Sequence, residues 1–419
     1  MLTSNILNLL LLPEEILKYI LSYVVYTDLL IIQNLSHKFL NFCHRHLDDL
    51  LRQFIHRKTN LSTTKYTRRY LLKLCKVPFD NNNISTGNNH SMVLTNDGYV
   101  YAFGDNEFGQ LGLNDNDNRN IPTLLSNCTH IINISCGISH SLILNINGTI
   151  YACGFNNHGE LGLGDIDDKN TPTLISDVNN IINVSCGNYH SLALTSYGDV
   201  YAFGRNDYGQ LGLGDNYDKI VPILLNLDDI IQITSGSYHS LLLTIQGHVY
   251  AFGHNINGDL GLGDNLDRNI PTLINTLPLN ICKISSKFFH SLVLTDDNKM
   301  YAFGANYLKQ LGLQDNINRN RPVLVSDNEQ NLHNIVQISC GDFHSLILRD
   351  NGQVYTFGIR NKNIPDFNDI VQISAGGVHS LLLVHGGVVY AFGHNKDGQL
   401  GLGDNEDREL PEIVISISV

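Results

Sequence analysis

The chain contains no tryptophan, only three methionines, and few charged residues, which make up 16% of its 419 positions. Its eight cysteines include no Cys-x-x-Cys pair, so the spacing typical of zinc ribbons and dithiol redox sites is absent. The apolar run from Ile6 to Leu12 is short, lacks a basic leader and stops at Pro13. We therefore expect neither a signal peptide nor a membrane span. The pattern favours an intracellular, reducing compartment, cytoplasmic or nuclear, without disulfides or a bound metal.

Charge is unevenly distributed along the chain. Acidic residues outnumber basic ones by 40 to 27, for a formal net charge of −13. The segment 51–78 nevertheless holds eight basic side chains and no acid. The remainder is strongly acidic and would repel a phosphate backbone, so we expect no nucleic-acid binding by residues 81–419.

One sequence unit recurs seven times from Ile84 to the C-terminus. In each copy a histidine precedes a serine and a short apolar run. These histidines are His90, His140, His190, His239, His290, His344 and His379. Their successive spacings are 50, 50, 49, 51, 54 and 35 residues, which indicates a repeat architecture.

Each unit contains the pattern of four short strands. A strand ending in Ile-Ser-x-Gly precedes His-Ser-Leu-x-Leu, and a tight turn such as Asp97-Gly98 leads into Val-Tyr-Ala-Phe-Gly. After a Gly-Gln-Leu-Gly-Leu-Gly connection, Pro-Thr-Leu-Ile starts a fourth strand at an edge, where proline is tolerated. A single four-stranded blade cannot bury both of its faces. The sequence therefore predicts an all-β protein, a seven-bladed β-propeller.

Two irregularities in the repeat lead to further expectations. The sixth unit lacks the Gly-Gln-Leu-Gly connection, so its strands should survive while one rim of the ring carries a notch. After Pro411 the chain ends in an alternating, strand-like segment. We expect Ile413 to Val419 to pair into the blade at the N-terminal seam and so fasten the circle.

The pattern G-x-x-H-S-L-x-L-T…G-x-V-Y-x-x-G-x-N-x-x-G-Q-L-G-L-G closely resembles the regulator of chromosome condensation repeat, over about 330 residues. Propellers of the Trp-Asp and kelch types carry tryptophan in their signatures, which this chain lacks. Where the resembled family often has tryptophan before the third-strand glycine, this chain has smaller residues. They are Phe103, Cys153, Phe203, Phe252, Phe303, Phe357 and Phe392.

Residues 12–43 show helical spacing of apolar side chains. The motifs Leu-Pro-x-Glu-Ile-Leu and Asp-Leu-Leu within them resemble the F-box, a helical module that binds a Skp-type adaptor of cullin–RING ligases. The resemblance implies that the adaptor contacts Leu12, Pro13, Ile16, Leu17, Ile20 and Leu21. An amphipathic helical pair packed against the propeller is the alternative. We expect a helical module at 1–50, a basic helical linker at 51–80 and the propeller at 81–419.

Several recurring side chains could suggest chemistry, yet each has a structural interpretation. One histidine per blade at a fixed place favours hydrogen bonding between neighbouring turns. The Asp-rich connections lack the distal glutamate of calcium loops and are followed by Lys or Arg, which favours a turn stabilised by Asp–base pairing. Because no nucleophile–base arrangement is evident, we expect no enzyme activity, cofactor or metal.

Residues that differ among the units lie at the ends of strands, and many of them are aromatic. They are either packing groups between blades or anchors for a target protein. The candidate target-binding residues are Phe108, Tyr189, Tyr208, Tyr238, Phe288, Phe289, Tyr307 and Phe343.

The resemblances favour an interaction protein that serves as the substrate receptor of a Skp–cullin–F-box ubiquitin ligase. A guanine-nucleotide exchange factor for a Ran-like GTPase is the alternative, although the even spacing leaves no room for the family namesake's β-wedge. A light sensor similar to the plant UV-B photoreceptor would need tryptophan chromophores, which are absent. A propeller scaffold without a ligase link is the third possibility.

Overall fold

The computed structural model describes residues 83–325, 332–359, 364 and 369–418. The chain divides into two units, 1–77 and 78–419, and all described residues lie in the second unit. The expected helical module, with its adaptor-binding residues, and the basic linker lie outside the described residues. The domain boundaries therefore stay predictions.

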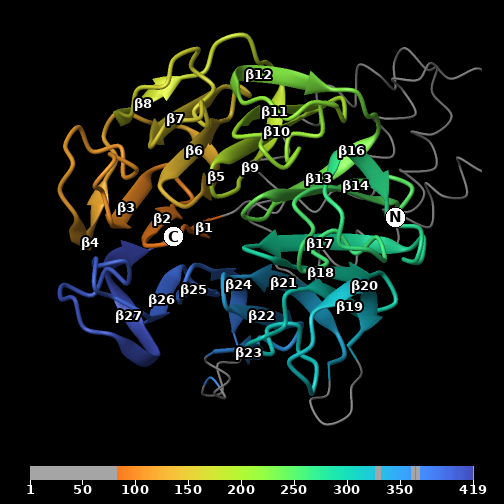
Figure 1. Ribbon diagram of the computed structural model, residues 1–419. Coiled ribbons are helices and arrows are strands. Elements are labelled where there is room, and N and C mark those ends of the chain that lie inside the picture. The colour runs from red at the N-terminus through yellow and green to blue at the C-terminus, as the bar shows by residue number, and fades with distance from the viewer. Residues whose placement is uncertain (1–82, 326–331, 360–363, 365–368, 419) are drawn as a thin grey trace, which may run out of the picture. The chain divides into compact units, whose positions relative to one another are not determined.

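The described residues form seven antiparallel sheets and no helix. Six sheets have four strands, and the sheet of the sixth unit has three, β21–β22–β23. In Figure 1 the sheets follow one another around a ring in chain order, from the orange first sheet to the blue last one. The innermost strand of each sheet contacts the innermost strand of the next, and the last such strand contacts the first. The predicted seven-bladed β-propeller is confirmed.

The strand bounds repeat closely from blade to blade. The first blade consists of β1 (Ile84–Thr86), β2 (His90–Leu94), β3 (Val100–Gly104) and β4 (Arg119–Leu124). The second consists of β5 (Ile131–Cys136), β6 (His140–Asn145), β7 (Ile150–Gly154) and β8 (Lys169–Leu174). The third consists of β9 (Ile181–Cys186), β10 (His190–Thr195), β11 (Val200–Gly204) and β12 (Lys219–Leu225). The fourth consists of β13 (Ile230–Ser235), β14 (His239–Thr244), β15 (Val249–Gly253) and β16 (Arg268–Leu273).

The remaining blades contain the two irregular units and the chain end. The fifth consists of β17 (Ile281–Lys287), β18 (His290–Thr295), β19 (Met300–Gly304) and β20 (Arg319–Leu324). The sixth consists of β21 (Ile335–Cys340), β22 (His344–Arg349) and β23 (Val354–Gly358). The seventh consists of β24 (Ile370–Ala375), β25 (His379–Val384), β26 (Val388–Gly393) and β27 (Arg408–Ser418). In the sixth unit the first three strands survive, but the expected fourth strand is not among the described residues.

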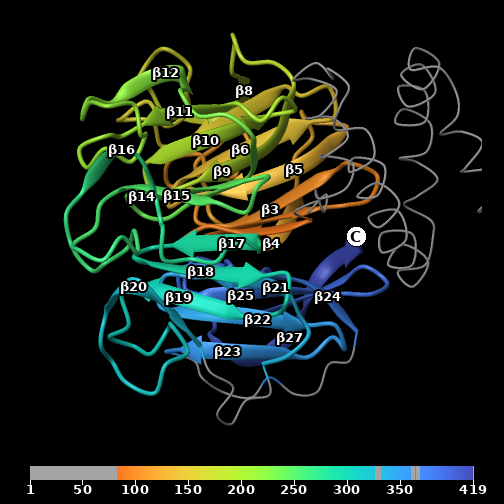
Figure 2. The ribbon, with the colours of Figure 1, turned by 90° about the vertical axis from the view of Figure 1, so that its right-hand side faces the viewer.

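Burial follows the position of each strand within its blade. In the fifth blade, for example, β17, β18, β19 and β20 lie side by side in that order (Figure 2). The second strand of a blade, such as β10, is buried at every residue, because neighbouring blades cover both of its faces. The outer strand, such as β16, is only half-buried and contains Pro271. Proline suits this outer position because an edge strand loses little when one N–H donor is missing.

Each interface between blades has its own apolar cluster. The cluster between the second and third blades contains Leu142, Leu161 and Phe203, all fully buried. A Cβ atom placed on Gly162 would lie 2.8 Å from the Phe203 ring, so the second glycine of this unit's Gly-Glu-Leu-Gly leaves room for the next blade's aromatic ring. Phenylalanine therefore fills the position that the resembled family often gives to tryptophan, without changing the architecture.

The seven repeated histidines form a hydrogen-bonded circuit between blades. In every case Nε2 lies 2.8–3.1 Å from the hydroxyl oxygen of the serine that follows the next histidine. The pairs are His90–Ser141, His140–Ser191, His190–Ser240, His239–Ser291, His290–Ser345, His344–Ser380 and His379–Ser91. The structural role predicted for the histidines is confirmed, although the partner is a strand serine of the next blade rather than a turn.

The serine's second hydrogen bond determines the histidine tautomer. Ser141 donates to the carbonyl oxygen of Gln110 at 2.8 Å, so its own oxygen must accept the proton of His90 Nε2. Nδ1 of His90 is then bare, and no described residue bonds to it. Burial keeps this ring neutral by lowering the pKa of His90 from 6.5 to about 3.

The glycine three positions before a histidine is closely surrounded. A Cβ atom on Gly137 would lie 2.4 Å from His140 Cε1 and 2.5 Å from the carbonyl oxygen of Gly187. Glycine is therefore required there for close packing. The fifth blade differs, since Lys287 takes this position and the next residue, Phe288, adopts a φ of 49°.

The small-residue position that ends the innermost strands holds three of the six described cysteines, Cys136, Cys186 and Cys340. The backbone N–H of Cys136 donates to Ser85 Oγ of the preceding blade at 3.0 Å, and that of Cys186 donates to Ser135 Oγ at 2.9 Å. Cys128, Cys136, Cys153, Cys186, Cys282 and Cys340 are all free thiols. Among the described residues no group of His, Cys, Asp or Glu side chains could hold a metal ion.

The ring does not close in the way that we expected. β27 pairs with β26 of its own blade, with Ile413 opposite Tyr390, and the first blade is completed by its own four strands. The expectation that Ile413–Val419 would pair into the N-terminal blade is wrong. The first described strand, β1, is innermost in its blade and the last, β27, is outermost, so each described blade comes from one continuous segment.

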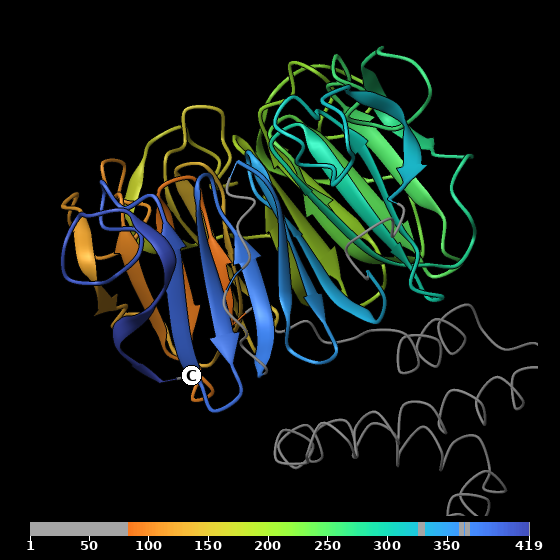
Figure 3. The same cartoon turned by 90° about the horizontal axis from the view of Figure 1, so that it is seen from below.

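Side chains and turns close the seam instead, where the blue last blade lies beside the orange first one (Figure 3). His379 bonds to Ser91 at 2.9 Å, and the N–H of Gly377 donates to the carbonyl oxygen of Gly87 at 3.0 Å. Val414 of β27 joins Ile84 and other residues of both blades in the seam's apolar cluster. The seam therefore has the same kinds of contact as the other interfaces.

Replacing Val414 by Ala should weaken the seam, because Val414 is only 1% exposed within this cluster. We expect the free energy of unfolding to fall by about 1–3 kcal/mol, measured by urea denaturation. Ile413→Ala is the matched control, since Ile413 is 57% exposed on the same strand. Equal stability of the two variants would contradict a role for Val414 in closure.

Stability should also fall as the pH is lowered. Burial lowers the pKa of His90, His140, His190, His239 and His290 from 6.5 to about 3. Between these values the unfolded chain binds more protons than the folded chain, so each histidine costs about 1.4 kcal/mol of stability per pH unit below about 6.5. Urea denaturation followed by tyrosine fluorescence from pH 7 to pH 4 would measure the loss.

Glu160 provides a control of opposite sign for this pH experiment. Burial raises the pKa of Glu160 from 4.5 to about 8, so this group stabilises the fold as the pH falls through 8. Glu160→Gln, which restores the residue found at Gln110 and Gln210, should raise stability at neutral pH and steepen the acid loss. Stability that stays constant down to pH 4 in both proteins would contradict the buried neutral histidines.

Candidate protein-interaction face

The variable residues gather at one end of the blades because of the antiparallel register. His190, which follows the first turn of its unit, pairs with Gly204, which ends the third strand. The residues before the histidine and those after the glycine therefore share one face of the ring. We call this the arc face.

Aromatic rings on this face form a continuous series of contacts from the first blade to the sixth. Neighbouring rings have centroids 4.2–6.4 Å apart, mostly in edge or tilted arrangements. The members of this aromatic arc are Phe108, Phe155, His158, Tyr189, Tyr208, Tyr238, His254, Phe288, Phe289 and Phe343. Each of these rings is half-buried. They pack between blades and each keeps part of its ring exposed, so the packing interpretation is confirmed and the anchor role stays a prediction.

Seven of the eight predicted target-binding residues belong to the arc, and Tyr307 does not. Tyr307 lies one position earlier in its connection than Phe108 and Tyr208 do in theirs. It is 40% exposed and makes no ring contact with the described residues. Phe155 and His254, which directly follow the third-strand glycine, belong to the arc but were not among the residues predicted to bind a target.

Arg205 was also missed, and it has the same sequence position as Phe155 and His254. Its guanidinium carbon lies 5.5 Å from the Tyr189 ring centroid and 5.3 Å from the Tyr238 centroid. The Nε of Arg205 donates to the Asp207 carboxylate at 2.7 Å. The cation is thus held between two rings of adjacent blades and is neutralised by its own carboxylate.

At the seam between the seventh and first blades, the positions that elsewhere bring two rings together hold carboxylates instead. Phe108 meets Phe155 across the first interface at 5.0 Å, and Tyr208 meets His254 across the third, also at 5.0 Å. At the seam these two positions are held by Asp397 and Asp105. Burial and then the neighbouring Asp105 charge raise the pKa of Asp397. The arc therefore ends at a pair of carboxylates.

Local ion pairs order the long connections on this face. Asp264 bonds to Arg268 at 2.6 Å, and Asp404 bonds to Arg408 at 2.6 Å. The same contact recurs in every complete unit, which confirms the predicted Asp–base turn. These carboxylates are thereby engaged by bases, as the prediction of a turn rather than a calcium loop requires.

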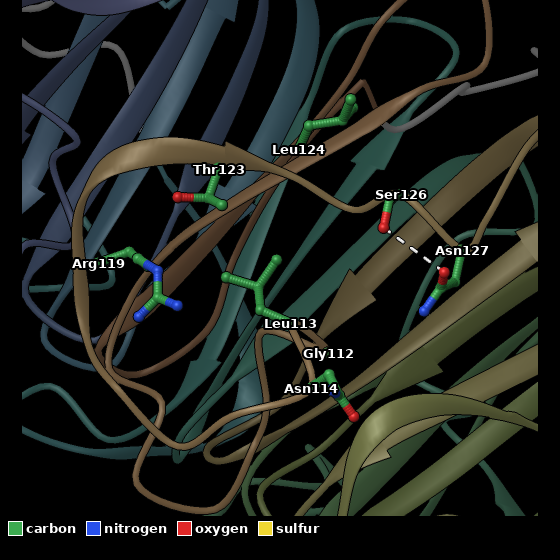
Figure 4. A pocket seen from close by; sticks show the side chains of 8 residues that line it. All are labelled: Gly112, Leu113, Asn114, Arg119, Thr123, Leu124, Ser126 and Asn127. Atoms are coloured by element: carbon green, nitrogen blue, oxygen red, sulfur yellow. Dashed lines mark hydrogen bonds between the residues drawn. The ribbon is translucent and has the colours of Figure 1, made fainter.

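The described residues offer a small hollow beside the first blade, shown in Figure 4. Its lining residues are Gly112, Leu113, Asn114, Arg119, Thr123, Leu124, Ser126 and Asn127. It is open and polar, with Ser126 and Asn127 in weak contact at 3.5 Å, and no arc residue lines it. No helix of the described residues is long and apolar enough to cross a membrane.

A ring of seven sheets with a variable, aromatic end face defines a propeller of the protein-interaction class. The RCC1-like domain family model matches residues 80–333, and the regulator of chromosome condensation (RCC1) repeat matches 335–363, 370–399 and 386–418. The chain belongs to the RCC1-like domain family. An F-box domain matches residues 9–49, which confirms the N-terminal resemblance.

Similar proteins share only part of their length with this chain. The Arabidopsis thaliana ultraviolet-B receptor UVR8 is 32% identical over 139 residues, 33% of this chain and 23% of that protein. The Homo sapiens probable E3 ubiquitin-protein ligase HERC4 is 47% identical over 62 residues, 15% of this chain and 6% of that protein. The chain thus spans less than a quarter of the curated relatives named here.

Two solved structures share the fold. Human WBSCR16 has a TM-score of 0.69 at 23% identity, covering 76% of this chain and 94% of that one. Prp20p from Saccharomyces cerevisiae, whose structure was reported with its binding to Gsp1p and histones, has a TM-score of 0.67 at 22% identity. That match covers 84% of this chain and 90% of Prp20p. The F-box and the propeller together make this chain a protein-interaction module.

Proposed function

We propose that this protein is the substrate receptor of a Skp–cullin–F-box ubiquitin ligase. The single observation that supports this role most is the combination of an F-box at residues 9–49 with a propeller whose constant framework carries a variable aromatic face. The F-box would bind the Skp-type adaptor through Leu12, Pro13, Ile16, Leu17, Ile20 and Leu21. The propeller would hold the target protein, and the ligase would supply the chemistry through proximity.

The target would bind on the arc face, with Phe108, Tyr189, Tyr208, Tyr238, Phe288, Phe289 and Phe343 as anchors and Tyr307 at its rim. Half-buried aromatic rings suit this role because they offer a large contact area and lose little side-chain freedom on binding. The rings are already held by contacts to their neighbours, so the surface is preorganised.

Replacing both Ile16 and Ile20 by Asp should abolish adaptor binding. Two aliphatic contacts would be lost and two charges would be placed in an apolar interface, which costs several kcal/mol, roughly 100-fold or more in affinity. A pull-down of purified full-length protein with a Skp-type adaptor measures the effect, and tyrosine fluorescence checks that the propeller stays folded. Adaptor binding equal to that of the unmodified chain would refute the proposal.

The fold shared with Prp20p keeps nucleotide exchange on a Ran-like GTPase as the second candidate function. The first proposal predicts that it is absent: addition of the purified chain should leave the rate of GDP release from such a GTPase at its intrinsic value. Release of a fluorescent GDP analogue measures this rate. Strong acceleration would favour the exchange factor over the ligase receptor.

A further inference from the structure

The partner chemistry of the arc face follows from two features that adjoin each other on the first blade. Phe108 begins the aromatic arc, and Asp105 lies three residues before it in the same connection. Asp105 is the first blade's half of the carboxylate pair at the seam, and Asp397 of the seventh blade is the other half. An apolar surface and an acidic one therefore lie side by side.

In the described part of the chain no Lys or Arg forms an ion pair with either carboxylate of the pair, and the base beside Asp397 is the His394 imidazole. From the described residues, the Asp105 carboxylate accepts the N–H of Glu107 at 3.1 Å and the side-chain amide of Gln110 at 2.9 Å. The Lys and Arg side chains nearest to Asp397 in sequence contact other carboxylates: Lys396 lies 4.0 Å from Glu406 in an exposed pair, and Arg408 lies 2.6 Å from Asp404. Two neighbouring carboxylates without a Lys or Arg partner favour a cation supplied from outside.

The wider charge of the arc face has the same sign. Its six long connections, each running from the residue after the third-strand glycine to the base that begins the fourth strand, contain nineteen Asp or Glu and nine Lys or Arg. Arg205, the cation inside the arc, is already paired with Asp207. A positively charged partner would therefore be attracted to this face, and an acidic one would be repelled.

We infer that the arc face binds a short peptide segment of the target in which a Lys or Arg lies within a few residues of an aromatic or large aliphatic side chain. The basic group would sit on Asp105 and Asp397, and the apolar group would pack on Phe108 and Phe155. The rest of the segment would follow the arc toward Tyr189. This inference rests on the proposed function, because it names the part of the target that the receptor recognises.

A phage-displayed library of random peptides, selected on the purified full-length chain, tests this chemistry directly. The peptides enriched should combine a Lys or Arg with a nearby aromatic or large aliphatic residue. Their affinity should fall as the salt concentration rises from about 0.1 M to 0.5 M, because the ion pair is partly exposed. Enrichment of acidic peptides, or of peptides without a basic residue, would overturn the inference.

Variants then locate the site, with an enriched peptide labelled for fluorescence anisotropy. Asp397→Asn keeps the shape of the side chain and should weaken binding by about fivefold or more, and Tyr189→Ala with Tyr238→Ala by at least about tenfold. Asp97→Asn and Tyr197→Ala are the matched controls. Both residues are exposed in the hairpin turns at the opposite end of the blades and should leave binding unchanged.

The two proposals can fail separately. The Ile16→Asp, Ile20→Asp protein should bind the peptide as tightly as the unmodified chain, whatever it does to the adaptor. Urea denaturation of the Tyr189→Ala, Tyr238→Ala variant shows whether it is still folded. If that variant is unfolded, its loss of binding says nothing about the site, and the isosteric Asp397→Asn variant then tests the inference. Peptide binding that is unchanged in both the Asp397→Asn variant and the double tyrosine variant would place the peptide elsewhere and refute the inference. A loss of binding that is equally large in the two control variants would refute it as well.

Discussion

The contact on which the rest of this propeller depends is the hydrogen bond from a buried histidine to the serine of the next blade. It occurs at all seven interfaces, the seam included, and joins strands that lie far apart in sequence. Burial keeps the imidazole rings neutral. In six blades the serine hydroxyl donates a hydrogen bond to a backbone carbonyl oxygen of the adjoining unit. Each bond therefore ties together three segments of chain. A ring built in this way needs no exchanged strand, since His379 and Ser91 close it with the contact used everywhere else.

A framework with such strict internal requirements leaves few places free to vary. Packing constrains the serine, the buried second strand and the glycine found near the histidine in six of the seven blades. The residues at the strand ends, by contrast, contact one another and the solvent. Lys287 shows how far the framework can adapt. Its ammonium group reaches from the fifth blade to the carbonyl oxygens of Thr86 and Gly87 in the first, and its burial lowers the pKa of that group. The neighbouring Phe288 has a positive φ of 49°, and its ring contacts Phe289 and Phe343 in the aromatic arc.

Recognition on the arc face would combine two physical terms with different roles. Aromatic rings that already contact one another supply apolar area at a small entropic cost, and this term governs how long a bound segment stays. The acidic connections and the Asp105–Asp397 pair act over a longer range, so they govern approach and the sign of the partner's charge. Because Arg205 is neutralised within the arc, the two terms do not oppose each other.

The repeat spacing and the turn residues alone determined the blade number, the four-strand unit, the structural histidines and the Asp–base turns, because each is a local pattern repeated several times. Tertiary structure decided what depends on how one blade meets the next. Three features involve residues about 50 positions apart or at opposite ends of the chain. They are the serine partner of each histidine, the packing of Val414 at the seam, and the contacts of Phe155, Arg205 and His254 in the arc. Sequence patterns show which residues share an element, but the side chains that meet across blades depend on the stacking of whole sheets. For that reason Tyr307, an aromatic residue one position out of register, resembled an arc member in sequence and makes no ring contact with the described residues in the fold.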